Sequence, residues 1–337
     1  MNDQIDLFGL QQSERDQVGL AEAALAHREI AAQLPSCVRF GTSSWTFPGW
    51  RNLIYQRAAS EQVLARYGLA SYAEHPLLRS VGLDRTYYSP MGQGEFARLA
   101  AQVPEDFRFL VEAHSVLTTP AGSASKRPTD GNLPDHYLDP CYAREHVIEP
   151  AVEGLGKQLG PILFQFPPLG VVHFRDPGRF CDSLSSFLEA LPRGPAYSVE
   201  LRNKEFLCRE YARLLARVGA SHCFNIHPQM PDVLKQAEIL GDEVWSGRSV
   251  VVRWVLHPGS EYEIARKRYF PFDRLIDPDL RSRLSLVELV TKILTQARDV
   301  VVIANNKAEG SAPQTIVKLA EECVRHWHAT TSGEEGS

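Results

Sequence analysis

The sequence has no uninterrupted run of 18 apolar residues, so no transmembrane helix is predicted. Its first residues lack the basic start and the long apolar stretch of a secretory signal. We therefore expect a cytoplasmic protein with no membrane contact. Its six cysteines form no Cys-x-x-Cys pair, which disfavours the common zinc and redox motifs and predicts reduced thiols.

An excess of basic residues is also missing. The chain has 36 Lys and Arg against 41 Asp and Glu, for a net charge of −5. Proteins that coat nucleic acid usually show the opposite balance, so this class is disfavoured, although a local basic patch is compatible with it. With 44% hydrophobic and 23% charged residues, the composition is that of an ordinary globular protein.

Eight short apolar runs alternate with amphipathic segments along the chain. The runs are residues 38–44, 80–87, 107–114, 161–166, 196–202, 221–227, 249–256 and 299–306. Such runs are typical of parallel strands buried on both faces. Helices are predicted at residues 61–72, 95–102, 142–158, 177–191, 206–218, 284–297 and 313–328. Pro150 should divide the helix at 142–158.

This alternation predicts an α/β fold, a parallel (β/α)8 TIM barrel, and 337 residues suit one such barrel. A doubly wound open sheet is the alternative, but the glycine-rich loop expected there after the first strand is absent. The predicted parts are a flexible tail and N-terminal helix (1–36, with the helix near 18–34), the barrel (37–330) and a disordered C-terminal tail (331–337). Two long segments, 115–140 and 257–280, are predicted as loops that are either lids or tolerated insertions.

Polar residues at the ends of apolar strands form the candidate site, because the C-terminal ends of barrel strands meet at one mouth. The predicted catalytic residues are Glu200, Arg202, Glu112 and Asp84, and the predicted substrate-binding residues are Trp45, Tyr88, Gln165, Arg253, Asn305 and Asn306.

Two features of this set have alternative interpretations. Glu200 and Arg202 lie in the same phase of one strand, so they either clamp a ligand or brace the rim as an ion pair. Asn305 and Asn306 either bind hydroxyls, phosphates or base edges, or cap a loop. Arg253 interrupts an apolar strand and must meet an anion or a carboxylate there.

Two chemistries can be compared with this pattern. Retaining glycosidase barrels often carry carboxylates at the ends of strands four and seven, where this chain has Gln165 and Arg253, so that chemistry is disfavoured. Acidic residues and histidines of several strands could converge on a metal, but no spacing motif supports this, and metal and cofactor stay unknown.

The segment 264–274 mixes basic and aromatic residues, which fits phosphate binding with base stacking or a solvated loop.

The stretch GTSSWTFPGWRNLIY at residues 41–55 resembles the opening motif of the YecE-like family, a set of barrels built on a domain of unknown function. The resemblance continues through 159–168, 197–202, the strand of Arg253 and 302–306. It implies a barrel and supplies no reaction. It also implies a shared pocket lined by Trp45, Gln165, Glu200, Arg202, Arg253, Asn305 and Asn306.

The chain departs from the family pattern at four places. Gly82 stands where the family usually has a glutamate, Glu112 replaces a lysine, Thr118 and Thr119 replace a Thr-His pair, and His257 is out of register with a His-Gly pair. The glutamate is lost at Gly82 and one is gained at Glu112, which is compatible with one carboxylate taking the place of the other.

The N-terminal peptide QIDLF at residues 4–8 resembles the short motif by which bacterial replication and repair proteins bind the sliding clamp. Leu7 and Phe8 would enter an apolar pocket and Gln4 would form hydrogen bonds. The alternative is that these residues pack on the bottom of the barrel.

Three functions are therefore open. The first is a hydrolase acting on a phosphorylated or sugar-containing substrate, with Glu200 as general acid or base and Arg202 and Arg253 binding an anion. The second is a DNA-repair-associated, nuclease-like protein, metal-dependent in one version, recruited by the sliding clamp. The third is a non-catalytic barrel that binds a small-molecule or nucleotide-type ligand.

Overall fold

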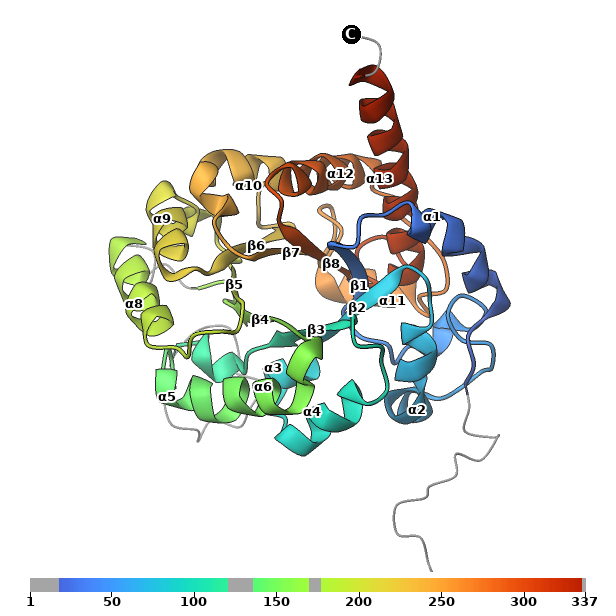
Figure 1. The fold of residues 1–337 in the computed structure, drawn as a ribbon, viewed down its shortest axis with the longest axis horizontal. Coiled ribbons are helices and arrows are strands. Elements are labelled where there is room, and N and C mark those ends of the chain that lie inside the picture. The colour runs from blue at the N-terminus through green and yellow to red at the C-terminus, as the bar shows by residue number, and fades with distance from the viewer. Residues whose placement is uncertain (1–17, 121–135, 170–176, 335–337) are drawn as a thin grey trace, which may run out of the picture.

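The computed structural model describes residues 18–120, 136–169 and 177–334. Its eight parallel strands form a closed barrel in chain order. They are β1 (Val38–Thr42), β2 (Leu78–Leu83), β3 (Arg108–Glu112), β4 (Leu159–Gln165), β5 (Tyr197–Glu200), β6 (Ser221–Ile226), β7 (Ser249–Trp254) and β8 (Asp299–Ala304). Pairing of β1 with β8 closes the ring seen in Figure 1. The predicted (β/α)8 barrel is confirmed, and the open sheet is wrong.

The apolar runs of the sequence are explained by the two faces of the barrel wall. One face packs on the helices in a large core cluster. Side chains of the other face form a second, smaller buried cluster of Leu110, Leu163, Cys223, Val251, Val301 and Ile303. Because both faces are buried, the strands show little polar alternation until they end.

Helices form an outer ring around the strands (Figure 1). They are α2 (Glu61–Ala73), α4 (Gln93–Ala100), α6 (Glu149–Leu155), α8 (Pro177–Glu189), α9 (Arg209–Val218), α10 (Val233–Leu240), α12 (Leu280–Thr295) and α13 (Ala312–Glu334). Polar caps start several of them: the Asp279 carboxylate accepts from the Ser282 backbone N–H at the start of α12. The sequence analysis did not predict α10, a helix of eight residues.

The second strand is shorter than predicted. It ends at Leu83, and residues Arg85–Tyr88 form a helical turn, α3, instead of continuing the strand to residue 87. The Thr86 hydroxyl lies 2.6 Å from both the Leu83 and the Glu112 carbonyl oxygens, which holds this turn against β3. The turn brings Asp84 to the mouth of the barrel.

The helical segment before β4 is divided, as Pro150 predicts. It consists of α5 (Pro140–Ala143), a π-helical turn (Arg144–Ile148) and α6, whose first turn contains Pro150. The proline ring cannot donate a backbone hydrogen bond, so the helix restarts around it.

The predicted loop 257–280 contains a helix, α11 (Tyr262–Tyr269). It lies over one end of the barrel instead of in the outer ring (Figure 1). The other predicted loop, 115–140, includes residues 121–135, which lie outside the described residues. Its described part forms a 3-10 turn at Ser115–Leu117 and reaches α5 at Pro140.

Both ends of the described chain differ from the expectation. The single N-terminal helix predicted near 18–34 is a 3-10 helix (Glu22–His27) followed by a short α1 (Arg28–Ala32). The helix α13 continues to Glu334, into the segment 331–337 assigned to a disordered tail. A helix already formed gains one hydrogen bond for each added residue, which explains the extension. Residues 1–17 lie outside the described residues.

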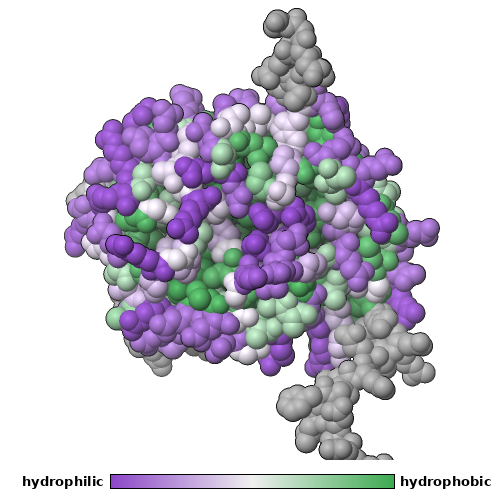
Figure 2. Space-filling model, in the orientation of Figure 1, coloured by the Kyte–Doolittle hydropathy of each residue, from purple (hydrophilic) through white to green (hydrophobic). Residues whose placement is uncertain are grey.

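Hydrophilic residues cover most of the rim of the face drawn in Figure 2, and hydrophobic residues appear there in small patches between them. Among the described helices, none combines the length and the apolarity needed to cross a membrane.

Candidate active site at the C-terminal face of the barrel

The guanidinium of Arg253, on β7, lies between two buried glutamates. Nη2 donates to Oε1 of Glu112 on β3, and Nη1 donates to Oε2 of Glu200 on β5, each over 2.6 Å. The predicted need of Arg253 for a carboxylate is therefore met twice. The strands concerned are far apart in the sequence and meet only because the barrel closes.

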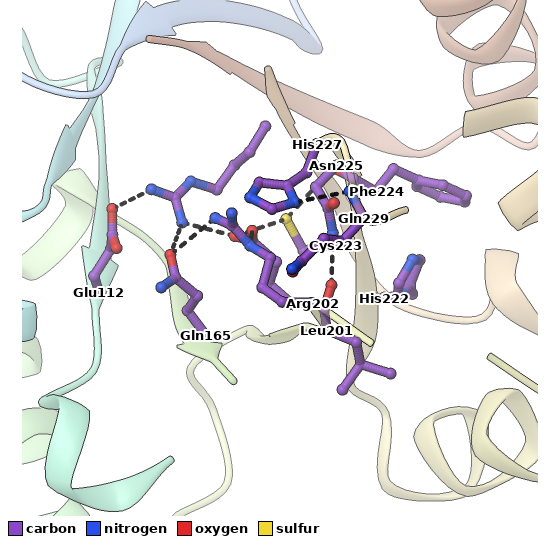
Figure 3. A network of polar contacts seen from close by, with 12 residues as sticks. Glu112, Gln165, Leu201, Arg202, His222, Cys223, Phe224, Asn225, His227 and Gln229 are labelled. Carbon is purple, nitrogen blue, oxygen red and sulfur yellow. Dashed lines mark hydrogen bonds and ion pairs between the residues drawn. The ribbon is translucent and has the colours of Figure 1, made fainter. Parts of the chain in front are cut away.

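Arg202 and Gln165 complete this buried charge network. Arg202 Nε donates to Glu200 Oε1 over 2.5 Å, so the two residues form an ion pair. Gln165 Oε1 accepts from Arg253 Nη1 over 2.7 Å and from Arg202 Nη2 over 3.3 Å. In Figure 3 the side chains of Glu112, Gln165 and Arg202 point toward one another across the end of the barrel.

The four charged members of the network are almost removed from water. Exposure is 0% for Glu200, 3% for Glu112, 6% for Arg253 and 8% for Arg202. Two guanidinium groups and two carboxylates give no net charge when all are ionised. Burying such groups is costly unless each is paired, so removal of one partner should destabilise the others.

The two glutamates differ in their affinity for a proton. Burial raises the pKa of Glu112 to about 7, because Arg253 only partly offsets it and the carboxylates of Asp84 and Glu200 reinforce it. Burial also acts to raise the pKa of Glu200, but Arg202 and Arg253 together outweigh it, and the pKa is lowered. One carboxylate can therefore exchange a proton near neutral pH while the other stays ionised.

A cavity of about 520 Å³ opens above the network at the C-terminal face. Its volume is in the range of small-molecule sites. Its charged lining residues are Asp84, Glu112, Arg202, Arg253, Arg266 and Lys307. Glu200 is not among the residues that line it. Of the other predicted substrate-binding residues, Tyr88, Gln165 and Asn305 also line this cavity.

Lys307 is a cavity residue that the sequence did not indicate. It follows Asn305 and Asn306 in the turn after β8, so its position at a strand end was the available signal. Burial lowers its pKa to about 8, although the Asp84 carboxylate opposes this. Burial in turn raises the pKa of Asp84, with Arg253 and Lys307 acting against it.

Asn306 lies away from the cavity. Its Oδ1 accepts from Trp50 Nε1 over 3.2 Å and from the Ala312 backbone N–H over 2.8 Å, and the residue is 1% exposed. It therefore holds the loop after β8 to the start of α13, which is the loop-capping alternative. Its neighbour Asn305 faces the cavity and donates to Ser43 Oγ over 2.9 Å.

Trp45 also lies outside the central cavity. Its ring is buried, and Nε1 donates to the Leu64 carbonyl oxygen over 3.0 Å. It lines a neighbouring groove of about 900 Å³. The central cavity and this groove are both lined by Phe47, Asp84, Arg266 and Phe272.

The basic and aromatic segment 264–274 forms one wall of this groove. Arg266 and Lys267 come from α11, and Phe270 is 73% exposed, whereas Tyr269 and Phe272 are packed into a small core cluster. The segment is thus partly a packed element and partly an open basic and aromatic surface.

Among the described residues, no three His, Cys, Asp or Glu side chains are grouped so that they could hold a metal ion. Of the acidic residues at the strand ends, Glu112 and Glu200 are engaged by arginines. His114 instead lies 2.7 Å from the Tyr142 hydroxyl through Nδ1.

The family of the chain follows from its sequence as a whole. A family described as "Protein of unknown function DUF72" matches residues 39–335. The chain belongs to the DUF72 family. This agrees with the YecE-like resemblance of the barrel motifs, and the match leaves the reaction open.

Solved structures of DUF72 proteins show the same fold. A DUF72 family protein from Enterococcus faecalis V583 is 17% identical, with a TM-score of 0.55 over 85% of this chain and 95% of that one. One from Thermotoga maritima MSB8 is 19% identical, with a TM-score of 0.55 over 85% of this chain and 98% of that one. No curated protein matches the chain.

The departures from the family pattern can now be placed. The carboxylate of Glu112 gives Arg253 a second anionic partner, whereas a lysine at this position would set a cation against it. Gly82, on β2, pairs in register with Leu110 and approaches the backbone of Ser43, where an added Cβ would lie 3.2 Å from the carbonyl oxygen. A larger side chain there requires the backbone of Ser43, just after β1, to give by a few tenths of an ångström.

Proposed function

We propose that this DUF72 chain is a hydrolase that acts on a phosphorylated or sugar-containing substrate bound at the C-terminal face of the barrel. The observation that carries the proposal is Glu112: a buried carboxyl group with a pKa raised to about 7, held by Arg253 and facing a cavity of substrate size. General acid and base groups work best when their pKa lies near the operating pH.

The proposed roles differ from those that the sequence favoured. Both carboxylate oxygens of Glu200 accept hydrogen bonds from arginines, and Glu200 does not line the cavity. We therefore assign proton transfer to Glu112 and make Glu200 a positioning residue that keeps Arg202 and Arg253 in place.

Positive charge around the cavity supports an anionic substrate. Arg202 uses Nε and Nη2 within the network, so Nη1 is left to donate to a ligand, and Arg266 and Lys307 line the same cavity. When Glu112 takes up a proton, the network gains one positive charge. A bound phosphate should raise the pKa of Glu112 further, because like charges disfavour ionisation.

The test is a hydrolysis panel that contains p-nitrophenyl phosphate, sugar phosphates, nucleoside monophosphates and p-nitrophenyl glycosides. Glu112→Gln should lower kcat at least about 100-fold, the size expected for a lost acid or base. Glu105→Gln is the matched control, because Glu105 is exposed and far from the mouth of the barrel. The wild-type pH profile of kcat/KM, which reports groups of the free enzyme, should bend near pH 7.

Two results would contradict the assignment. Full activity of Glu112→Gln would remove this residue from the proton transfer. Strong thermal stabilisation by phosphorylated compounds without turnover of any would support the non-catalytic ligand-binding barrel instead.

The groove beside the cavity supports a second candidate, a nucleic-acid-directed function. Exposed Phe270 next to Arg266 and Lys267 offers a stacking surface with cations for phosphates. Phe270→Ala should weaken binding of a single-stranded oligonucleotide at least about fivefold by lost stacking. An unchanged affinity would remove this candidate surface.

Recruitment by the sliding clamp depends on residues 4–8, which lie outside the described residues, so it stays a prediction. Deletion of residues 1–10 should abolish binding to a purified clamp in fluorescence polarisation without changing thermal stability. Retained binding would contradict the motif.

Elemental analysis by mass spectrometry tests whether the nuclease-like function is metal-dependent. That hypothesis predicts near-stoichiometric zinc, manganese or iron in the purified protein.

A further inference from the structure

We propose that Lys307 is a carbonyl-reactive amine, which forms an imine with an aldehyde or ketone that carries a phosphate group. This is a separate reactivity of the same cavity and does not depend on the proposed hydrolysis. It names the chemical class of a ligand, a phosphorylated carbonyl compound.

The position of Lys307 is that of an enclosed nucleophile. The residue is 8% exposed and lines the cavity at the end of β8. Its Nζ lies 4.4 Å from the centre of the Tyr262 ring, on α11, which covers it from one side. The face of this ring favours the ammonium form. Within the described part of the chain, no carboxylate lies at ion-pair distance from Nζ, so no salt bridge adds to that effect.

The charges that face Lys307 come from two sides. Asp84, after β2, and Glu263, on α11, favour its ammonium form, whereas Arg266 disfavours it. Burial is larger than any of these effects and lowers the pKa to about 8. At pH 7 roughly a tenth of such an amine is neutral, against well under a thousandth for an ordinary lysine. Only the neutral amine attacks a carbonyl carbon.

The reaction needs no oxidant or reductant. The lone pair of neutral Nζ forms a bond to the carbonyl carbon while the π electrons move to oxygen, and a proton passes from nitrogen to that oxygen. The resulting carbinolamine hydroxyl takes up a second proton and leaves as water, which yields the protonated imine.

Asp84 is the available proton donor for the loss of water. It lines the same cavity, and burial raises its pKa, so a larger fraction of it carries a proton than for an exposed aspartate. It could take that proton back when water hydrolyses the imine.

The phosphate requirement follows from the rest of the cavity wall. Arg202 and Arg266 line the same space as Lys307, so an anionic group bound by them would place a carbonyl on the same ligand near Nζ. Guanidinium groups bind phosphate oxygens through paired donors. A carbonyl compound without a phosphate lacks this anchor.

The experiment uses the full chain and glycolaldehyde phosphate as the probe. Sodium cyanoborohydride reduces any imine to a stable secondary amine, and peptide mass spectrometry then locates it. Lys318 is the internal control, since it is an exposed lysine paired with Glu321. At pH 7 we expect Lys307 to be labelled at least about tenfold faster than Lys318, because more of it is neutral.

Two comparisons complete the test. Plain glycolaldehyde should label Lys307 much more slowly than its phosphate, and inorganic phosphate should compete with the phosphorylated probe. Lys307→Arg, which keeps the charge, should abolish labelling at this position, whereas Lys318→Arg should leave it unchanged.

Labelling of Lys307 no faster than Lys318 in the wild-type chain would overturn the proposal, and this result needs no variant that folds. Equal labelling by phosphorylated and plain glycolaldehyde would overturn the phosphate requirement. Neither outcome depends on hydrolysis, so failure of imine formation at Lys307 can be distinguished from failure of the proposed hydrolase activity.

Discussion

Replacing Glu112 by glutamine should change stability in a way that depends on pH. The side chain keeps its shape and can still accept from Arg253 Nη2, but it can no longer ionise. The folded-state pKa of Glu112 is raised from 4.5 to about 7. A group of this kind stabilises the fold below the unfolded-state pKa, and that contribution is lost as pH rises through the folded-state pKa.

The size of the effect follows from the two pKa values. A difference of about 2.5 at about 1.36 kcal/mol for each pKa unit gives an upper limit of about 3 kcal/mol. Relative to wild type, Glu112→Gln should therefore gain up to about 3 kcal/mol between pH 4.5 and pH 8. Below pH 4.5 the difference between the two proteins should not change with pH.

Glu200→Gln is the matched comparison, because it changes the other glutamate bound to the same arginine. The pKa of Glu200 is lowered, so its carboxylate stabilises the fold above its unfolded-state pKa, and this contribution is lost as pH falls. The variant leaves two buried guanidinium groups short of a carboxylate and should lose about 3–5 kcal/mol near pH 7.

Urea denaturation followed by circular dichroism, at pH values from 3 to 9, gives the free energy of unfolding of each variant. Opposite signs of the pH dependence for the two glutamine variants are the expected result. A constant difference between Glu112→Gln and wild type across this range would refute the reasoning about burial.

Three further changes test individual contacts. Arg253→Met should cost about 3–5 kcal/mol in urea denaturation, because buried Glu112 loses the arginine that it pairs with and buried Glu200 loses one of its two; a cost below about 1 kcal/mol would contradict this. Asn306→Ala should cost about 1–3 kcal/mol in the same assay, because two buried donors, one of them Trp50 Nε1, lose their acceptor. Gly49→Ala should lower the Tm by several degrees in differential scanning calorimetry. An added Cβ at Gly49 would lie 1.8 Å from the Pro271 carbonyl oxygen. An unchanged Tm would show that the segments of Gly49 and Pro271 move apart at little cost in free energy.

The order of strands and helices could be predicted from the sequence, because a strand that is buried on both faces requires apolar residues at successive positions. The run VVVRWVL predicts a buried parallel strand and at the same time marks Arg253 as an exception that needs an anion. Both expectations come from local sequence, and the barrel that they predict is the one observed.

Helices outside that pattern could not be foreseen. The segment that forms α11 has three consecutive basic residues and little apolar periodicity, so local sequence favours a loop. Its contacts come from elsewhere: Tyr269 and Ala265 are buried with Leu256 in a small core cluster. Tertiary packing of this kind stabilises short helices whose own propensity is weak.

The sequence by itself determined which residues stand at the strand ends and therefore which ones could form a site. Only the tertiary structure decided their roles. Glu112 and Arg253 are 141 residues apart in the chain, and their contact exists because the barrel closes. The raised pKa of Glu112 and the enclosed amine of Lys307 depend on how many neighbours from distant strands exclude water, and the lowered pKa of Glu200 depends on the arginines that the barrel brings to it. Desolvation is a property of the assembled cavity, and no local pattern of residues encodes it.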